Sequence, residues 1–349
     1  TAFGIADDEW QQAVISQIGK VQHMSNLYYT EPCALLAEML CKKTGMKKVF
    51  FSNSGAEANE CAIKAARKYA CDKWVRENPE KDPSECDKYT IVTLKNSFHG
   101  RTLTTLAATG QDVFHQLFCP LTPGFEYVAP NDIQELYELA KTTGIAGVMI
   151  ECVQGEGGVN PLDKEYIQAV RKFTEENDII MIVDEVQTGN GRTGELYSYM
   201  NFDIMPDVVS TAKGLAGGLP MGATLLGTKV ENVFGAGDHG STFGGNPVCA
   251  SAALSVISRI DERLMAEVKE KSRFIFESFE GAEGVESVSG LGLMIGIKTV
   301  KPAAEIVNKC IENGVLCLTA KDKVRLLPAI NIPMEVLKKA MDIIISACK

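Results

Sequence analysis

Residues 179–185 read IIMIVDE, a run of five apolar side chains that ends in two carboxylates. A short, unbroken apolar run is typical of a strand buried on both faces, as in a parallel sheet. Similar apolar runs predict strands at KVFFS (48–52), TIVTL (90–94) and AGVMI (146–150). Two weaker candidates are VVST (208–211) and ATLLG (223–227). Helix-like segments lie between them, at 56–71, 133–141 and 165–176. This alternation predicts an α/β fold whose central sheet is mainly parallel and covered by helices.

The pattern changes near residue 246. A long helix-like stretch at 247–279 is followed by four shorter elements: a strand at 292–297, a helix at 303–313, a strand at 324–327 and a helix at 334–348. We therefore expect three parts. They are an N-terminal helical arm at 1–45, a large domain at 46–246 and a small C-terminal α+β domain at 247–349.

Composition excludes several classes of protein. The net charge of −10 disfavours binding to nucleic acid. No apolar stretch reaches the roughly 18 residues that a membrane span needs. The 11 cysteines are scattered without a CxxC pair, which favours reduced thiols and a cytoplasmic protein. The four histidines are far apart in the sequence, so we expect no metal site.

Charged side chains follow the carboxyl ends of three predicted strands. They are Glu151, Asp184 and Lys213. Ligands of open α/β sheets bind at this edge, so these groups are expected to converge on one site. A lysine among small apolar neighbours (STAKGLAGG) is partly desolvated and becomes a usable nucleophile, although a surface lysine is the simpler interpretation. Asp184 needs a partner, which a salt bridge or a helix cap would also supply.

The segment SGAEANE at 54–60 predicts a helix start. Ser54 and Glu57 form the pattern of a capping box. Gly55 and Ala56 would leave backbone N–H groups open to an anion such as phosphate. An ordinary capped helix explains the same residues.

Six motifs occur together and in order: SGAEANE, NSFHGRT at 96–102, GEGGV at 155–159, VDEVQTGNGRTG at 183–194, AKG at 212–214 and HGSTFGGNP at 239–247. In this order the chain resembles the class III (ornithine-type) aminotransferases, and SNLYYTEP at 25–32 and LAATGQ at 106–111 are similar to acetylornithine-type members. The resemblance implies the fold type I architecture, pyridoxal 5'-phosphate as cofactor, and transfer of the terminal amino group of N-acetylornithine to 2-oxoglutarate in arginine biosynthesis.

The resemblance also implies roles for single residues. Lys213 would hold the cofactor as a Schiff base and then move a proton between substrate and cofactor, while Asp184 would pair with the ring nitrogen. The remaining contacts to the cofactor would come from Gly55 and Ala56 (phosphate), Phe98 and Val186 (the two ring faces), Gln187 (near the phenolic oxygen) and Thr242 (the phosphate in the neighbouring subunit).

Substrate contacts and assembly follow from the same resemblance. Arg101 would grip the substrate carboxylate, helped by Ser241 of the neighbouring subunit. Arg325 would bind the α-carboxylate of glutamate or 2-oxoglutarate, with Glu156 as a gate that pairs with it. The partners implied are amino-acid and 2-oxo-acid substrates and a second copy of the chain, in a homodimer with active sites at its interface. Surface salt bridges remain the alternative for both arginines.

The chain departs from the family pattern near its start. Family members carry a glycine- and histidine-containing stretch after GIA, and further residues before it. Here Ala6 is followed directly by DDEW. We expect the mass of the purified protein to exceed that of the 349 residues.

Other functions stay open at this point. Related donors are ornithine, succinylornithine and 4-aminobutyrate. Residues 210–213 fit the SxxK pattern of serine acyl enzymes, but KTG at 43–45 precedes it, which is the wrong order. Residues 189–194 fit GxGxxG, but no strand leads directly into this segment. A pyridoxal-phosphate-binding module without catalysis would have lost a key group, whereas Lys213, Asp184 and Arg101 are all present.

Overall fold

The computed structural model describes the whole chain, residues Thr1–Lys349. A seven-stranded sheet in the order β1-β9-β8-β7-β4-β2-β3 forms its centre. The strands are β1 (Lys48–Ser52), β2 (Thr90–Leu94), β3 (Phe125–Val128), β4 (Ile145–Ile150), β7 (Ile180–Asp184), β8 (Val208–Thr211) and β9 (Gly222–Leu226). Strand β9 alone runs in the direction opposite to the other six strands, so the prediction of a mainly parallel sheet is confirmed. All six strands predicted for this part of the chain are present, and β3 is the one strand of this sheet that was not predicted.

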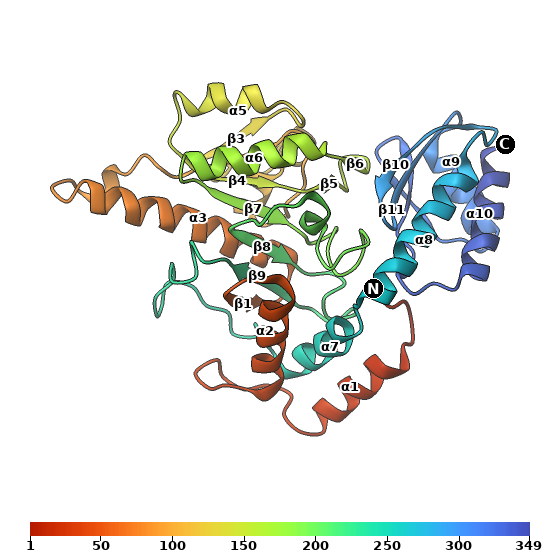
Figure 1. Cartoon of the computed structure of the whole chain (residues 1–349), viewed down its shortest axis with the longest axis horizontal. Helices are drawn as coiled ribbons and strands as arrows, with labels where there is room; N and C mark the ends of the chain where they lie inside the picture. The colour runs from red at the N-terminus through yellow and green to blue at the C-terminus, as the bar shows by residue number, and fades with distance from the viewer.

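Helices cover both faces of this sheet (Figure 1). The helix α3 (Gly55–Glu77) packs on one face, and α6 (Lys164–Glu176), with α5 (Ile133–Ala140) beside it, covers the other. Side chains alternate between the two faces along each strand. Thus Ile182 joins the apolar cluster under α3, whereas its neighbour Val183 joins the larger cluster under α6. This double burial explains why the strands read as unbroken apolar runs.

The N-terminal segment and the start of the C-terminal part pack together. The helices α1 (Asp8–Ile18) and α2 (Glu31–Thr44) both contact α7 (Pro247–Ser258). The prediction of one long helix over residues 247–279 is wrong, because α7 ends before a second helix, α8 (Glu262–Phe279). The Asp261 side chain accepts a hydrogen bond from the backbone N–H of Leu264 at 2.8 Å. This bond caps the start of α8, so α8 is a separate helix from α7.

A second, four-stranded antiparallel sheet lies in the C-terminal part, in the order β10-β11-β13-β12. Its strands are β10 (Val285–Leu291), β11 (Met294–Thr299), β12 (Leu318–Ala320) and β13 (Lys323–Leu326), and its helices are α8, α9 (Ala303–Glu312) and α10 (Met334–Cys348). The smaller α+β unit is therefore present. Helix α7 falls within the proposed C-terminal domain, 247–349, but it packs on α1 and α2 of the proposed N-terminal arm. The division into three domains at residues 45 and 246 therefore stays a proposal.

The remaining elements are short. They are α4 (Leu103–Ala108), β5 (Val153–Gln154), β6 (Asn160–Pro161) and the 3-10 turns Pro83–Glu85, Asp112–Phe114 and Ser198–Phe202. None of the helices combines the length and apolar character that crossing a bilayer requires.

Candidate active site

A cavity of about 350 Å³ opens at the carboxyl ends of the central strands, and we call it the central cavity. Strands β4, β7 and β8 are neighbours in the sheet. Their ends therefore bring Glu151, Asp184 and Lys213 to the same wall. The cavity is also lined by Asn53, Ser54, Gly55, Ala56, Asn59, Phe98, His99, Gly100, Val186, Gln187, Ala212, Gly218, Leu219, Pro220 and Met221.

The start of α3 forms the opposite wall. Ser54 is its N-cap, and its hydroxyl accepts a hydrogen bond from the N–H of Glu57 at 3.2 Å. The Glu57 carboxylate accepts from the N–H of Asn53, one residue before the cap. The N–H groups of Gly55 and Ala56 have no partner. A side chain at position 55 would meet the Val186 Cγ1 atom at 2.6 Å, so glycine is needed for the close approach of the two walls.

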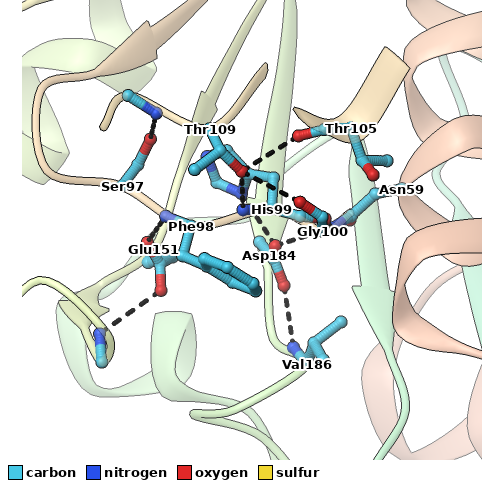
Figure 2. Close-up of polar contacts among 12 residues, drawn as sticks. Asn59, Ser97, Phe98, His99, Gly100, Thr105, Thr109, Glu151, Asp184 and Val186 are labelled. Atoms are coloured by element: carbon cyan, nitrogen blue, oxygen red, sulfur yellow. Dashed lines mark hydrogen bonds and ion pairs between the residues drawn. The ribbon is translucent and has the colours of Figure 1, made fainter. Parts of the chain in front are cut away.

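Asp184 is held by three hydrogen bonds (Figure 2). Its Oδ2 atom accepts from Asn59 Nδ2 and from His99 Nδ1, both at 2.8 Å. Its Oδ1 atom accepts from the N–H of Val186 at 2.9 Å. A carboxylate only accepts, so His99 carries its proton on Nδ1. The fixed carboxylate faces the cavity, ready to accept a further N–H donor.

Lys213 follows β8 and adopts a left-handed backbone with φ of 47°, which is uncommon outside glycine. Its side chain is exposed to the cavity, and the cavity walls around it exclude part of the solvent. This burial lowers the pKa of the Lys213 amine, although the charges of Asp184 and Glu151 oppose the change. The amine makes no hydrogen bond or ion pair within the chain. It is therefore a free nucleophile beside a fixed carboxylate.

An ion pair joins the large sheet region to the second sheet. The Nη1 atom of Arg325, on β13, donates to Glu156 Oε1 at 2.7 Å and to Gln187 Oε1 at 3.4 Å. Burial raises the pKa of Glu156, but the hydrogen bond and the charge of Arg325 outweigh it, so the pKa lies below its usual value. Arg325 is buried and its Nε atom has no partner. The guanidinium thus keeps a donor free for another acceptor.

Five predicted residues do not line the central cavity: the paired Glu156 and Arg325, and also Arg101, Ser241 and Thr242. Arg101 is exposed, and its guanidinium carbon lies 5.5 Å from the centre of the Phe98 ring and 4.8 Å from that of Phe114. No carboxylate pairs with it, so a surface salt bridge is not its role in this chain. Ser241 accepts a hydrogen bond from Asn53 Nδ2 at 3.1 Å, and Thr242 is exposed.

Two of the competing patterns do not form the required sites. Ser210 lies inside β8, wholly buried, with its hydroxyl away from any opening. A nucleophile there would be out of reach of a substrate. The segment 189–194 forms turns that lead to a 3-10 turn and not to a helix, so it lacks the N-terminus that a dinucleotide site needs.

Sequence reasoning missed the roles of Asn59 and His99 and gave none to Glu151. Asn59 and His99 lie inside the motifs SGAEANE and NSFHGRT, and they meet Asp184 only in the fold. A signal was available for Asn59, because an amide on the buried side of a helix needs a polar partner. No spacing in the sequence relates it to residue 184.

The chain matches known proteins over nearly its full length. Residues 1–348 match the family model described as aminotransferase class III. The chain is 47% identical to the acetylornithine aminotransferase of Haemophilus ducreyi, over 98% of this chain and 85% of the relative.

Solved structures of aminotransferases also match the fold of this chain. The ornithine aminotransferase of Toxoplasma gondii superposes with a TM-score of 0.91 at 28% identity, over 99% of this chain and 82% of that one. The N-acetylornithine aminotransferase of Stenotrophomonas maltophilia superposes with a TM-score of 0.83 at 32% identity, over 98% and 86%. This chain therefore belongs to the class III, pyridoxal-phosphate-dependent aminotransferases.

Proposed function

We propose that this chain transfers the terminal amino group of N-acetylornithine to 2-oxoglutarate, as a step of arginine biosynthesis. The observation that carries the proposal is the meeting of Lys213, Asp184 and the open start of α3 in one cavity. The names of the relatives support the substrate, since those from Haemophilus ducreyi and Methanocaldococcus jannaschii, at 47% and 43% identity, are acetylornithine aminotransferases.

The residues of the cavity fit pyridoxal 5'-phosphate. Two unpartnered N–H groups at the start of α3, those of Gly55 and Ala56, suit a phosphate, which the positive end of the helix dipole favours. The Asp184 carboxylate suits a protonated ring nitrogen. The Lys213 amine suits an aldehyde. These three groups lie in a cavity of about 350 Å³, within the range of cofactor sites.

When bound, the cofactor supplies an electron sink that stabilises negative charge on the substrate carbon that carries the amino group. Lys213 would hold the cofactor through its amine, and the same amine would move the proton at that carbon. Asp184 keeps the ring nitrogen protonated, and Asn59 and His99 keep Asp184 oriented. Phe98, Val186 and Gln187 also line the cavity. Phe98 and Val186 would pack against the two ring faces, and Gln187 would hydrogen-bond near the phenolic oxygen.

Arg325 and Glu156 select between the two substrates. Glu156 neutralises Arg325 while N-acetylornithine presents its terminal amine. When glutamate or 2-oxoglutarate binds, Glu156 releases Arg325 to its α-carboxylate. Arg101, with no carboxylate partner in this chain, grips the substrate carboxylate at the other end of the site.

A second copy of the chain completes the site in this proposal. Ser241 and Thr242 lie beside the cavity and do not line it, as expected of residues that serve a neighbouring site. Large apolar side chains are exposed on residues 27–29 and next to Thr242, which favours burial of this surface against the second copy. They are Leu27, Tyr28, Tyr29 and Phe243. We also propose a cytoplasmic location, since all eleven cysteines are free.

A panel of amino donors tests the substrate. The purified holoenzyme is assayed with 2-oxoglutarate and N-acetylornithine, succinylornithine, ornithine or 4-aminobutyrate. We expect the highest kcat/KM with N-acetylornithine. A higher value with succinylornithine, the donor in the name of a relative from Yersinia pseudotuberculosis at 39% identity, would assign the chain to that activity instead.

A further inference from the structure

The carboxyl group of Glu151 joins two loops of the active site, and the proposed mechanism gives it no part. Its Oε2 atom accepts a hydrogen bond from the backbone N–H of Phe98 at 3.0 Å. Its Oε1 atom accepts one from the N–H of Gly155 at 3.4 Å. The side chain is buried just after the end of β4, and Figure 2 shows its contact with Phe98. One carboxyl group thus bonds to both loops.

Each of the two loops carries a residue that has a role in the proposed function. The first, residues 95–101, carries Phe98 at the ring of the cofactor; we call it the stacking loop. The second, residues 155–158, carries Glu156 and hence the ion pair with Arg325; we call it the gate loop. Gly155 directly precedes Glu156, so the Glu151 carboxyl bonds to the backbone one residue from the gate.

Other contacts press the same loops together. The Gln154 side chain donates to the carbonyl of Lys95 at 2.9 Å. A side chain at position 157 would meet the carbonyl oxygen of Asn96 at 2.5 Å, so only glycine permits the approach. In the stacking loop these contacts reach Lys95 and Asn96, whereas Glu151 bonds to the N–H of Phe98 itself.

We propose that Glu151 is a positioning residue that couples the stacking loop to the gate loop, so that Phe98 and the Glu156–Arg325 pair take their working positions together. This inference rests on the proposed function for the roles of Phe98 and Glu156.

The contact requires a carboxylate, the form that Glu151 takes above its pKa of about 7, so the half-reactions are followed above that pH. Both partners are N–H donors, so both arms of the side chain must accept. An amide of the same shape offers one oxygen, and its NH2 group would face the second N–H. In Glu151→Gln the oxygen takes the shorter contact, with Phe98, and the gate loop loses its bond. The variant therefore uncouples the loops with little change in volume.

The test follows the holoenzyme through each half-reaction separately. Single-turnover absorbance changes give kcat/KM with N-acetylornithine and with glutamate. In Glu151→Gln we expect the ratio of the two values to shift toward glutamate by about tenfold, the effect of losing one hydrogen bond to a buried charged group. We also expect weaker circular dichroism in the cofactor's absorption band, because the stacking loop keeps its bond to residue 151 but is no longer tied through it to the gate loop.

Glu185→Gln is the matched control. Glu185 is as buried as Glu151 and accepts hydrogen bonds from Ser198 and Thr188 at 2.6 Å, yet it does not line the cavity. We expect a loss of stability without a shift in the ratio. An equal shift in both variants, or no shift in Glu151→Gln, overturns the proposal.

A second variant protects the test against misfolding. Gln154→Ala removes a clamp between the same loops, and we expect a smaller shift in the same direction. If Glu151→Gln fails to fold and Gln154→Ala leaves the ratio and the dichroism unchanged, the coupling is refuted. Failure of the proposed function can be told apart from failure of the coupling. If the proposed function is wrong, the wild type itself gives no half-reaction with N-acetylornithine. The comparison of dichroism does not depend on that donor.

Discussion

The guanidinium of Arg325 lies 2.7 Å from the carboxylate of Glu156, although the two residues are far apart in the sequence and lie in different parts of the fold. Glu156 follows the hairpin strand β5, and Arg325 sits on β13 of the C-terminal sheet. The Glu156 side chain is 35% exposed and that of Arg325 is 9% exposed. A carboxylate that reaches solvent can leave, whereas the arginine is fixed. This asymmetry suits a gate whose moving part is Glu156.

Removal of the Glu156 carboxylate should change the KM values of the two substrates in opposite directions. In Glu156→Ala the α-carboxylate of glutamate meets no competitor at Arg325, so we expect its KM to fall. The KM for N-acetylornithine should rise by about tenfold, because Arg325 is left buried and unpaired. Steady-state kinetics with each substrate varied checks this. Glu138→Ala, which breaks only an exposed pair with Lys141, serves as control. Parallel changes in both KM values would refute the gate.

A methyl group at position 55 should weaken cofactor binding. Alanine favours helix over glycine, so Gly55→Ala would ordinarily stabilise the start of α3. Here the added carbon meets Val186 Cγ1 at 2.6 Å and pushes it into the cavity. We expect the Kd for pyridoxal phosphate to rise by about tenfold or more. Gly19→Ala, whose nearest neighbour would be 3.6 Å away, should leave the Kd unchanged. Fluorescence titration measures both.

The large domain could be predicted from sequence because its strands are buried on both faces. The runs at 48–52, 90–94 and 208–211 match β1, β2 and β8 residue for residue. Strand β3, with the sequence FEYV, and strand β10, with VESVSGL, were missed. Both lie at sheet edges and are only partly buried, so polar residues interrupt their apolar pattern.

The site could be predicted in part for a related reason. Glu151, Asp184 and Lys213 follow apolar runs, and parallel strands bring such ends together. Nothing in the local sequence shows that Asn59 and His99 both bind Asp184, because that contact depends on how α3 and the stacking loop pack above β7. The bond of Glu151 to two backbone N–H groups is hidden for the same reason.

Glu151 should make stability depend on pH. Burial raises the pKa of its carboxyl from 4.5 to about 7, with the charge of Asp184 adding to the effect and that of His99 opposing it. A folded pKa above the unfolded one means that the folded state favours the proton. The stabilisation is complete below pH 4.5 and is lost as pH rises through about 7.

The measurement compares the wild type with Glu151→Gln, both free of cofactor. Between pH 5 and 8 the free energy of unfolding of the wild type should fall relative to the variant, by on the order of 3 kcal/mol. Denaturant titrations at several pH values give this difference. A difference that does not vary with pH would contradict a proton on Glu151 in the folded state.

Lys213 should be unusually reactive for a lysine. Burial lowers the pKa of its amine, so a larger fraction is uncharged near neutral pH. Capture of pyridoxal phosphate by the cofactor-free protein should therefore slow only when pH falls through this lowered pKa. Stopped-flow absorbance at several pH values measures the rate. Borohydride should then fix the cofactor to the chain, and Lys213→Ala should show neither the fixed cofactor nor transamination. Labelling that persists in this variant would place the bond on another lysine.

Hybrid dimers should show whether Thr242 serves the neighbouring site. Consider one subunit with Lys213→Ala and one with Thr242→Asp, whose carboxylate repels the cofactor phosphate. Each homodimer is inactive. If Thr242 acts across the interface, the hybrid keeps one site with an intact Lys213 from one subunit and an intact Thr242 from the other. Random mixing makes half of the dimers hybrid, so the mixture should regain about one quarter of wild-type activity. If Thr242 acts in its own subunit, both sites of the hybrid carry a defect. The mixture then stays inactive, and the proposal of a site shared between subunits is wrong.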